Sequence, residues 1–346
     1  MAQFKSVIYD ISGRCNANCL YCESGRMCKA KGGFVSPILF EKTLQTLRKK
    51  QIAGDETVIA LYCWGEPFLH PQLPELIKII NGHSFRYGFS TNASKIPLVD
   101  AAFVNNLDHL WFSMPGFSEK SYRRVHGFSF DVIINNIKRI TEAAKAQRFS
   151  NIAIRYHVYQ FNVDELMRCR EFADELGIRF EPAYAILNNW SLVNGYFDNT
   201  LDVRMLRQIS QDVFCHGIDE AIAKAPMDYD CPQYQHFVLD EQSNVSICCQ
   251  VSRDEQFRCG DLFAGDMDEM MQYRRNNPVC KACIGKGLAY YLHNFLVEPG
   301  FYRQMVNLKE RLEAPEWRGS AGREFIKKCL PPVLLDLVRR VSGHQR

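Results

Sequence analysis

Three cysteines stand close together near the start of the chain. Cys15, Cys19 and Cys22 form the run Cys-Asn-Ala-Asn-Cys-Leu-Tyr-Cys, directly after an apolar stretch. Thiolates bind iron–sulfur clusters, and a four-iron cluster held by only three cysteines keeps one iron free to bind another molecule. Zinc is the alternative, but structural zinc takes four ligands, and only Cys28 is near enough to serve as the fourth. The spacing therefore favours a cluster with one open iron.

A second set of cysteines comes from a later part of the chain. It consists of Cys231, the adjacent pair Cys248 and Cys249, and the pair Cys280 and Cys283, two residues apart. Apolar residues around a polar turn predict a β-hairpin over residues 236–247, and a helix over 267–275 precedes a loop with the last pair. Four thiolates that converge from these elements could surround zinc or a four-iron cluster.

Composition and the N-terminal sequence narrow the class of protein. Of the 346 residues 47% are hydrophobic, 23% are charged and 14 are cysteines, which is ordinary for a globular protein except in cysteine. The N-terminus lacks the apolar segment of a signal peptide, and the chain has no run of 18 apolar residues. So many cysteines without a secretory signal indicate metal or cluster binding in a reducing cytoplasm, where we expect this protein.

The net charge of +3 is unevenly distributed. Residues 318–346 contain seven Lys or Arg and two acidic residues, so the remaining chain is close to neutral. A near-neutral body lacks the basic surface that nucleic-acid binding requires, so we expect no nucleic-acid partner. Between Pro331 and Val341, apolar residues at helical spacing predict a helix docked on the core, with a peripheral membrane or partner contact as the alternative.

Apolar segments predict alternating strands and helices. The expected strands are 4–11, 57–63, 85–90, 109–114, 151–159 and 178–182, and the expected helices are 38–50, 72–80, 118–126, 131–147, 164–176 and 201–224. Six strands that are each followed by a helical segment imply parallel pairing. The predicted fold class is α/β: a partial (β/α)6 TIM-like barrel, then a small β-hairpin/helix domain, then a helical tail. The expected boundaries are 1–225, 226–286 and 287–346.

Alternation along the strands predicts which side chains enter the barrel. On the fifth strand the apolar residues share one face, so Arg155, His157 and Tyr159 should point into the lumen. Arg155 could clamp a carboxylate or form a structural ion pair. His157, Tyr159 and Glu181 are candidate catalytic or substrate contacts, and a buried structural role is the alternative for each.

The three-cysteine run, with Gly65-Glu66-Pro67 after the second strand, resembles the radical SAM superfamily over residues 4–285. The resemblance implies that Cys15, Cys19 and Cys22 bind a [4Fe–4S] cluster whose open iron holds S-adenosylmethionine. Reduction of that cluster would yield a 5′-deoxyadenosyl radical, which abstracts hydrogen from a substrate. Trp64 departs from the family, which usually has glycine there, and is expected to narrow the cavity.

The same resemblance implies contacts to S-adenosylmethionine. Gly65, Glu66 and Pro67 would approach its amino group, because glycine allows close approach and glutamate can order an ammonium group. Tyr21 stands where the family commonly places an aromatic residue on the adenine. The remaining implied contacts, to ribose and carboxylate, are Ser90, Asn92 and Ser113; ordinary turn and packing roles are their alternatives.

The second cysteine set resembles the twitch region, a shortened SPASM extension that carries one auxiliary [4Fe–4S] cluster. The implied ligands are Cys231, Cys248, Cys280 and Cys283. Cys248 is preferred to Cys249 because family members place this ligand three residues after the hairpin valine. A zinc ribbon remains the alternative. Cys259 is interpreted as a loop packing residue, and Cys28, Cys63, Cys169, Cys215 and Cys329 as small buried side chains.

The resemblance implies a radical SAM oxidoreductase but leaves the substrate open. With only fourteen residues before Cys15, a fused peptide-recognition domain is not expected, which favours a small sugar-like or cyclitol substrate that is dehydrogenated or epimerised. A peptide-modifying maturase that works with a separate recognition partner is the second hypothesis. A non-catalytic iron–sulfur or zinc protein is the third. Flavodoxin or ferredoxin would supply electrons.

Overall fold

The computed structural model describes residues 4–25, 32–214, 218, 221–251 and 254–294. The predicted tail helix over 331–341 and the cysteines Cys28, Cys215 and Cys329 lie outside these residues. No helix in this part of the chain is both long and apolar enough to cross a membrane.

One nine-stranded sheet organises the molecule, in the order β6-β5-β4-β3-β2-β1-β7-β8-β9. The strands are β1 (Ser6–Tyr9), β2 (Val58–Ala60), β3 (Arg86–Thr91), β4 (Leu107–Met114), β5 (Ile152–Val158), β6 (Arg179–Tyr184), β7 (His236–Leu239), β8 (Asn244–Ser246) and β9 (Arg258–Asp261). Strands β1 to β6 are parallel and adjacent in chain order, so the predicted α/β fold with a partial TIM-like barrel is confirmed. Strand β7 pairs parallel with β1, and β8 and β9 continue antiparallel.

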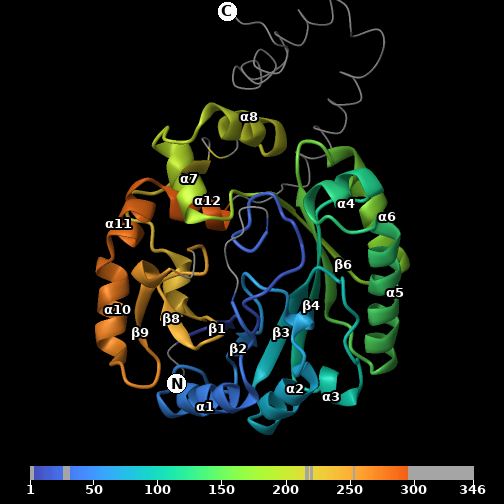
Figure 1. Cartoon of the computed structure of the whole chain (residues 1–346), viewed down its shortest axis with the longest axis horizontal. Coiled ribbons are helices and arrows are strands. Elements are labelled where there is room, and N and C mark those ends of the chain that lie inside the picture. Colours follow the sequence, from blue (N-terminus) through green and yellow to red (C-terminus); the bar gives the residue numbers. More distant parts are fainter. Residues whose placement is uncertain (1–3, 26–31, 215–217, 219–220, 252–253, 295–346) are drawn as a thin grey trace, which may run out of the picture.

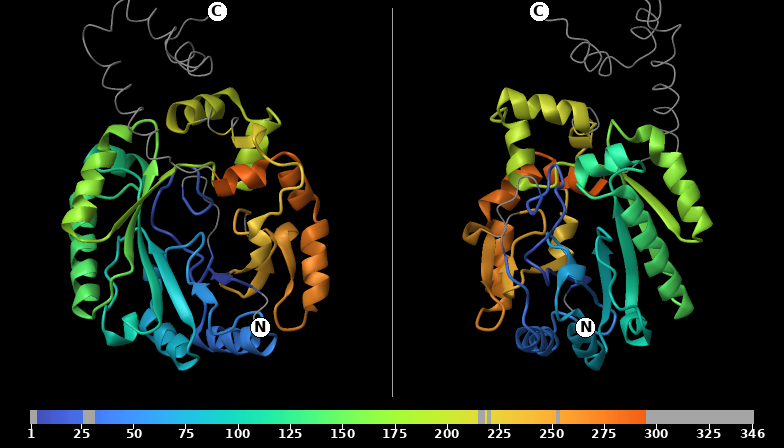
Figure 2. Two further views of the ribbon diagram at one scale, coloured as in Figure 1. Left: turned by 180° about the vertical axis from the view of Figure 1, so that it is seen from behind. Right: turned by 45° about the vertical axis from the view of Figure 1, so that its right-hand side comes forward.

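The helices cover the outside of the curved sheet and one of its ends (Figures 1 and 2). They are α1 (Pro37–Lys49), α2 (Leu73–Gly82), α3 (Ala101–Val104), α4 (Glu119–Val125), α5 (Phe130–Ala146), α6 (Leu166–Glu175), α7 (Trp190–Phe197), α8 (Val203–Asp212), α10 (Met267–Asn276), α11 (Pro278–Gly285) and α12 (Leu288–Asn294). Helices α1 to α6 alternate with the strands because each crossover must return the chain to the same end of a parallel sheet.

The main core lies between the sheet and these helices. Ile152, Ile154, Tyr156 and Val158 of β5 are fully buried in it, which confirms the predicted outward face of this strand. The predicted alternation ends at Val158, because β5 stops there. Tyr159 follows the last residue of the strand, and its ring packs in a second cluster that contains Leu20 and Tyr21.

The hairpin after residue 230 forms as predicted, but two neighbouring predictions were wrong. Cys259 lies in strand β9 rather than in a loop, because residues 258–261 pair with β8 around a register shift. Cys280 and Cys283 lie on helix α11 rather than in a loop, because Asn277 caps a helix that begins at Pro278.

Candidate active site

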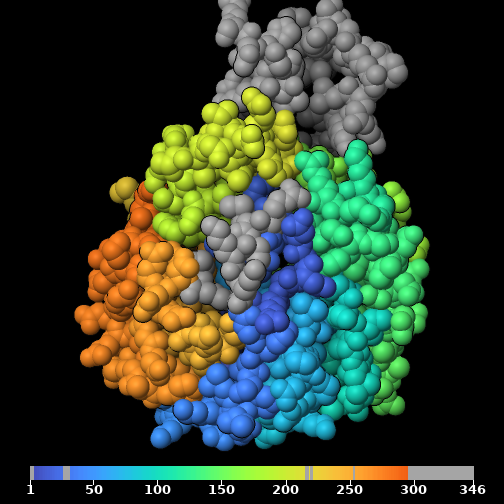
Figure 3. Space-filling view, in the orientation of Figure 1, coloured from blue at the N-terminus to red at the C-terminus, as the bar shows by residue number. Residues whose placement is uncertain are grey.

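The three-cysteine loop follows β1 at the carboxyl end of the sheet. In Figure 3 the N-terminal segment, coloured blue, lies between the orange C-terminal strands and helices and the green helices of the barrel. The Gly25 amide donates to the Cys22 carbonyl (3.1 Å), and a Cβ on Gly25 would lie 2.4 Å from the Cys19 carbonyl oxygen. The loop therefore closes tightly around its three cysteines.

The three thiols lie close enough to influence one another. Burial raises the pKa of Cys15 to about 12 and of Cys22 to about 11. Burial also raises the pKa of Cys19, and the neighbouring Cys22 and Cys15 raise it further. Thiols with such pKa values stay protonated at neutral pH unless a metal centre binds them. Three sulfur ligands in one loop are a donor set that fits an iron–sulfur cluster.

The Gly-Glu-Pro turn is held against this loop. The Asp10 carboxylate accepts hydrogen bonds from the amides of Trp64 (3.0 Å) and Gly65 (3.2 Å). A Cβ on Gly65 would lie 1.5 Å from the carbonyl oxygen of Ser12, so only glycine fits here. The Trp64 indole donates to the Val251 carbonyl (3.1 Å) and so joins the turn to the C-terminal region.

Glu66 is a buried carboxylate that organises backbone groups. Its oxygens accept from the amides of Phe68 (3.1 Å) and Asn92 (2.7 Å) and from the Thr91 hydroxyl (2.7 Å). Burial raises the pKa of Glu66 to about 7, although these hydrogen bonds lower it. Pro67 is buried at the start of the short 3₁₀ helix that follows. The turn thus connects the cysteine loop to the end of β3.

Two of the three predicted ribose and carboxylate contacts lie near the end of β3. The Asn92 side-chain amide lies 3.8 Å from the Cys15 sulfur and donates to the Asn16 side chain (3.1 Å). Ser90 is half-buried, two residues earlier. Ser113, on β4, shares a hydrogen bond with His157 Nε2 (3.4 Å) instead.

The hydroxyl group of Tyr21 forms a hydrogen bond within the protein. It donates a hydrogen bond to the buried Asp212 carboxylate (2.8 Å), which also pairs with Arg124. Asp212 ends helix α8, so this contact ties the cysteine loop to the helices above the barrel. The contact of Tyr21 with adenine stays a prediction. It would involve the ring of Tyr21 and not its hydroxyl group.

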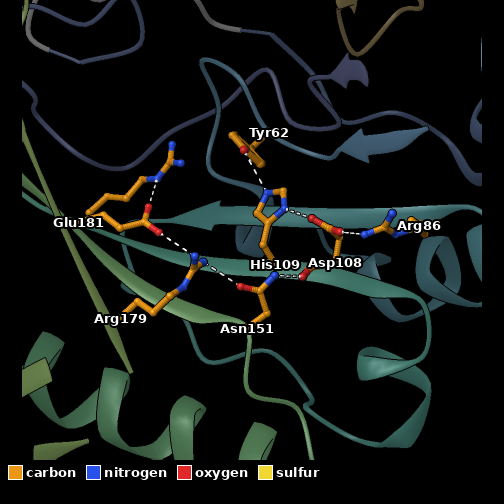
Figure 4. A network of polar contacts seen from close by, with 8 residues as sticks. Tyr62, Arg86, Asp108, His109, Asn151, Arg179 and Glu181 are labelled. Carbon is orange, nitrogen blue, oxygen red and sulfur yellow. Dashed lines mark hydrogen bonds and ion pairs between the residues drawn. The ribbon is translucent and has the colours of Figure 1, made fainter. Parts of the chain in front are cut away.

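Charged and aromatic side chains line the barrel interior. Arg155 donates to Glu181 (3.2 Å), and Glu181 also pairs with Arg179 (3.2 Å) (Figure 4). The Arg155 guanidinium lies 3.2 Å above the Trp111 ring. Burial lowers the pKa of His157 to about 4, so this imidazole is neutral at physiological pH. Arg155 of β5 and Glu181 of β6 are therefore an ion pair between neighbouring strands, with His157 two residues after Arg155 on β5.

Sequence reasoning missed a group of polar residues in the same interior. His109 lies between Tyr62, whose oxygen is 3.1 Å from Nε2, and Asp108, whose carboxylate is 2.8 Å from Nδ1. Asp10 was also missed, although an aspartate directly after an apolar strand is a weak signal of a site at the strand end. Nothing in the sequence brings Tyr62 and His109 together, because their contact crosses β3.

Four cysteines line a single cavity between the hairpin, α11 and α12, which we name the four-cysteine cavity. They are Cys231, Cys248, Cys280 and Cys283, the four residues predicted as a second ligand set. The thiol of Cys249 instead lies 3.3 Å from the Gln233 side-chain oxygen, outside the cavity lining. Hydrogen bonding to Cys249 lowers the pKa of Cys248 to about 7. Four thiols around one cavity suit a soft metal centre such as an iron–sulfur cluster or zinc.

Arg274 forms part of the wall of the four-cysteine cavity. The residue is only 2% exposed, and its guanidinium donates to the backbone carbonyls of Ile247, His236 (2.8 Å) and Gln233 (2.5 Å). These three carbonyls belong to the segments that carry Cys231 and Cys248. Arg274 therefore holds the hairpin in place beside the cavity.

No three His, Cys, Asp or Glu side chains of the described residues are arranged around one point as ligands of a single metal ion. In a four-iron cluster each cysteine binds a different iron, so its ligands stand farther apart than those of one ion. The wide grouping of the cysteines is compatible with such clusters.

The radical SAM superfamily profile matches residues 9–172. The chain contains a radical SAM domain. This domain runs from the end of β1 into α6 and includes the three-cysteine loop, the Gly-Glu-Pro turn and the interior of β4 and β5. No curated protein matches the chain.

Solved structures share the fold. The structure described as native anSMEcpe with bound AdoMet has a TM-score of 0.53 at 15% identity, covering 90% of this chain and 87% of its own. Streptococcus suis SuiB bound to the precursor peptide SuiA has a TM-score of 0.53 at 13% identity, covering 82% of this chain and 67% of its own. At these identities the likeness concerns the fold, which extends beyond the radical SAM domain.

Proposed function

We propose that this protein is a radical SAM oxidoreductase that binds a [4Fe–4S] cluster through Cys15, Cys19 and Cys22. The observation that carries the proposal is the contact of the Gly-Glu-Pro turn with the cysteine loop, where Gly65 lies against Ser12 without room for a Cβ. When bound, the reduced cluster supplies the electron that cleaves S-adenosylmethionine into methionine and a 5′-deoxyadenosyl radical.

The proposed binding of S-adenosylmethionine uses groups around the loop. The bare backbone of Gly65 admits close approach. The Glu66 carboxylate accepts from the backbone amide of Asn92, whose side-chain amide lies 3.8 Å from the Cys15 sulfur. A bound ammonium group would favour the ionised form of Glu66, whose pKa burial has raised to about 7. Ser90 and Ser113 are the proposed hydroxyl contacts, and the Tyr21 ring is the proposed contact for adenine.

An auxiliary [4Fe–4S] cluster is proposed for the four-cysteine cavity, with Cys231, Cys248, Cys280 and Cys283 as ligands. Four protein ligands leave no open iron, so electron transfer suits this cluster better than substrate binding. Trp64 supports a connection between the two sites, because its indole donates to Val251, which lines the cavity. A small carrier such as flavodoxin or ferredoxin is the proposed electron donor.

A small polyhydroxylated molecule is the proposed substrate. The barrel interior offers many hydrogen-bonding groups, among them Ser113, His157, Tyr62 and Arg155. Arg155 already has the Glu181 carboxylate as its partner, which favours a substrate with hydroxyl groups over one whose carboxylate needs a clamp. A sugar or cyclitol that loses hydrogen from a ring carbon meets this description, and dehydrogenation or epimerisation would follow.

Transfer of deuterium tests this function. The anaerobically reconstituted, reduced protein is mixed with S-adenosylmethionine and a panel of ring-deuterated sugars and cyclitols, and deuterium in 5′-deoxyadenosine is measured by mass spectrometry. Incorporation from a member of the panel is the expected result. Incorporation from a deuterated peptide panel alone would replace the substrate proposal with the peptide-modifying alternative, and failure to bind S-adenosylmethionine would contradict the enzyme itself.

A further inference from the structure

A chain of three hydrogen-bonded side chains crosses the barrel interior. Asp108 and His109 are adjacent on β4, and Tyr62 follows β2 (Figure 4). The His109 Nδ1 lies 2.8 Å from the Asp108 carboxylate, and Nε2 lies 3.1 Å from the Tyr62 oxygen. Figure 4 shows the imidazole between its two partners, with Arg86 beyond Asp108. Carboxylate, imidazole and hydroxyl thus form a continuous series.

The chemistry of the groups fixes the direction of these bonds. An ionised carboxylate only accepts, so the proton of a neutral His109 is on Nδ1 and points to Asp108. Nε2 is then an acceptor, and the Tyr62 hydroxyl donates to it. The lone pairs of the Tyr62 oxygen remain available to accept a hydrogen bond from another molecule in the interior.

The imidazole ring is fixed on both of its faces. A Cβ on Gly88 of β3 would lie 2.1 Å from the His109 Cε1 atom, so the ring sits where a side chain would otherwise be. The Trp111 indole stacks on the ring with centroids 3.7 Å apart and planes inclined by 22°. His109 itself is only 6% exposed. Such enclosure holds the ring in one orientation, as a proton-transfer group requires.

Charged groups from four strands surround this series. Burial lowers the pKa of His109, and Arg155 of β5 lowers it further. Asp108 raises this pKa, but by less than burial lowers it. Glu181 of β6 also raises it. For Tyr62, burial raises the pKa, and Arg155 acts against this. The nearby Cys63 and Cys249 thiols also raise the pKa of Tyr62, and Arg86 of β3 pairs with Asp108.

We propose that Tyr62 and His109 accept the hydroxyl proton of the substrate while its alcohol is oxidised, and that Asp108 is their positioning residue. The inference rests on the proposed function and names the proton acceptor of that site. A secondary alcohol that loses the hydrogen atom of its carbon becomes a ketone only when it also loses the hydroxyl proton and one electron. The O–H bond breaks as the carbonyl double bond forms.

The proton follows the hydrogen bonds just described. The Tyr62 oxygen takes the substrate proton as its own proton moves to His109 Nε2, and the Asp108 carboxylate stabilises the resulting imidazolium. The electron goes to a one-electron acceptor of the iron–sulfur class, the auxiliary cluster under the proposed function. After turnover, the imidazolium returns its proton to solvent. This role resembles that of a histidine positioned by a carboxylate in other general-base systems.

Nitrogen NMR tests the series without any substrate. In the full-length protein labelled with ¹⁵N-histidine, His109 should show a protonated Nδ1 and an unprotonated, hydrogen-bonded Nε2 at pH 7. Tyr62→Phe should shift the Nε2 signal, and Asp108→Asn should produce a mixture of the two tautomers. Tyr87→Phe, which alters another buried tyrosine whose hydroxyl bonds to Phe103, is the matched control. A His109 with protonated Nε2, or an Nε2 signal that Tyr62→Phe leaves unchanged, would overturn the proposal.

The ratio of ketone to 5′-deoxyadenosine tests whether these residues accept the substrate proton during turnover, with myo-inositol as the probe. Tyr62→Phe and His109→Gln should still release 5′-deoxyadenosine, but the ketone formed per 5′-deoxyadenosine should fall on the order of 100-fold. Asp108→Asn should lower the ratio and change its dependence on pH, which a merely structural residue would not do. An unchanged ratio in Tyr62→Phe and His109→Gln would overturn the role. Absence of inositol oxidation by the unmodified protein would count against the proposed substrate. The NMR signals would still show whether Asp108, His109 and Tyr62 form the hydrogen-bonded series.

Discussion

Gly65 stands so close to Ser12 that a Cβ on Gly65 would lie 1.5 Å from the Ser12 carbonyl oxygen. Ser12 belongs to the segment that enters the three-cysteine loop, and Gly65 begins the Gly-Glu-Pro turn. The Glu66 amide also donates to the Arg14 carbonyl (2.8 Å). The loop and the turn are therefore one structural unit, although Ser12 and Gly65 are 53 positions apart in the sequence.

Replacing Gly65 with alanine should disrupt this unit. Because backbone stands where the new methyl group would be, the turn must move away from Ser12, and S-adenosylmethionine binding should weaken at least about tenfold, or roughly 1.4 kcal/mol. Isothermal titration of the reconstituted protein would measure this. Gly82→Ala is the matched control, since a Cβ at Gly82 meets no atom within 4 Å. Equal affinity in the two variants would contradict the close packing of turn and loop.

Glu66 should make the stability of the unoccupied protein depend on pH. Burial raises its folded-state pKa from 4.5 to about 7, so the folded state keeps its proton while the unfolded state loses it. The contribution of Glu66 is therefore fully present below pH 4.5 and is lost as the pH rises to about 7. At roughly 1.4 kcal/mol per pKa unit, the loss amounts to about 3 kcal/mol.

Urea unfolding under anaerobic, reducing conditions would measure this dependence. Histidines such as His126, whose pKa burial lowers to about 3, have the opposite effect: the stability that they contribute is lost at acid pH. Glu66→Gln keeps these histidines, so the difference between the two proteins isolates Glu66. The unmodified protein should lose stability relative to the variant between pH 4.5 and 7. A constant difference would show that Glu66 has an ordinary pKa.

Cys248 and Cys249 should behave differently although they are adjacent. Cys248 lines the four-cysteine cavity, whereas Cys249 does not. Cys248→Ala should therefore lower the iron content of the reconstituted protein from about eight to about four atoms, and Cys249→Ala should leave it unchanged. Iron and sulfide analysis would decide, and the reverse pattern would make Cys249 the ligand. Zinc in place of four irons in the unmodified protein would make the site structural.

Arg274 should stabilise the C-terminal hairpin. Arg274→Met removes the guanidinium from three carbonyls, those of Gln233, His236 and Ile247, which should cost about 3 kcal/mol of unfolding free energy. Arg275→Met is the control, because the adjacent Arg275 is exposed. Denaturant unfolding of both variants would measure the difference. A loss of stability no greater than that of the control would show that the buried guanidinium does not hold the hairpin.

Much of the barrel could be predicted because its signals are local. The buried face of β5 alternates strictly through Ile152, Ile154 and Tyr156, and the three-cysteine run has a spacing that suits a cluster with an open iron. The β7–β8 hairpin was found in the same way, from apolar residues around the turn at 241–244. Each of these features depends on neighbours in the sequence.

The features that the sequence did not predict depend on contacts between residues far apart in the chain. Strand β9 contains Gly260, whose φ is 151°, and a register shift, so its residues show no regular alternation. Helix α11 is short, and its one local signal is Asn277 before Pro278. The Tyr62–His109 contact requires the missing side chain of Gly88 on the strand between them, a relationship that only the sheet register reveals.

Cys19 is the central residue of the three-cysteine loop, which is the proposed origin of the radical chemistry. The decisive measurement is 5′-deoxyadenosine release by the anaerobically reconstituted, reduced protein beside its Cys19→Ala variant. The unmodified protein should contain about eight irons and release 5′-deoxyadenosine, and the variant should keep about four irons and release none. Release by Cys19→Ala at the unmodified rate, or binding of S-adenosylmethionine by neither protein, would contradict the central claim.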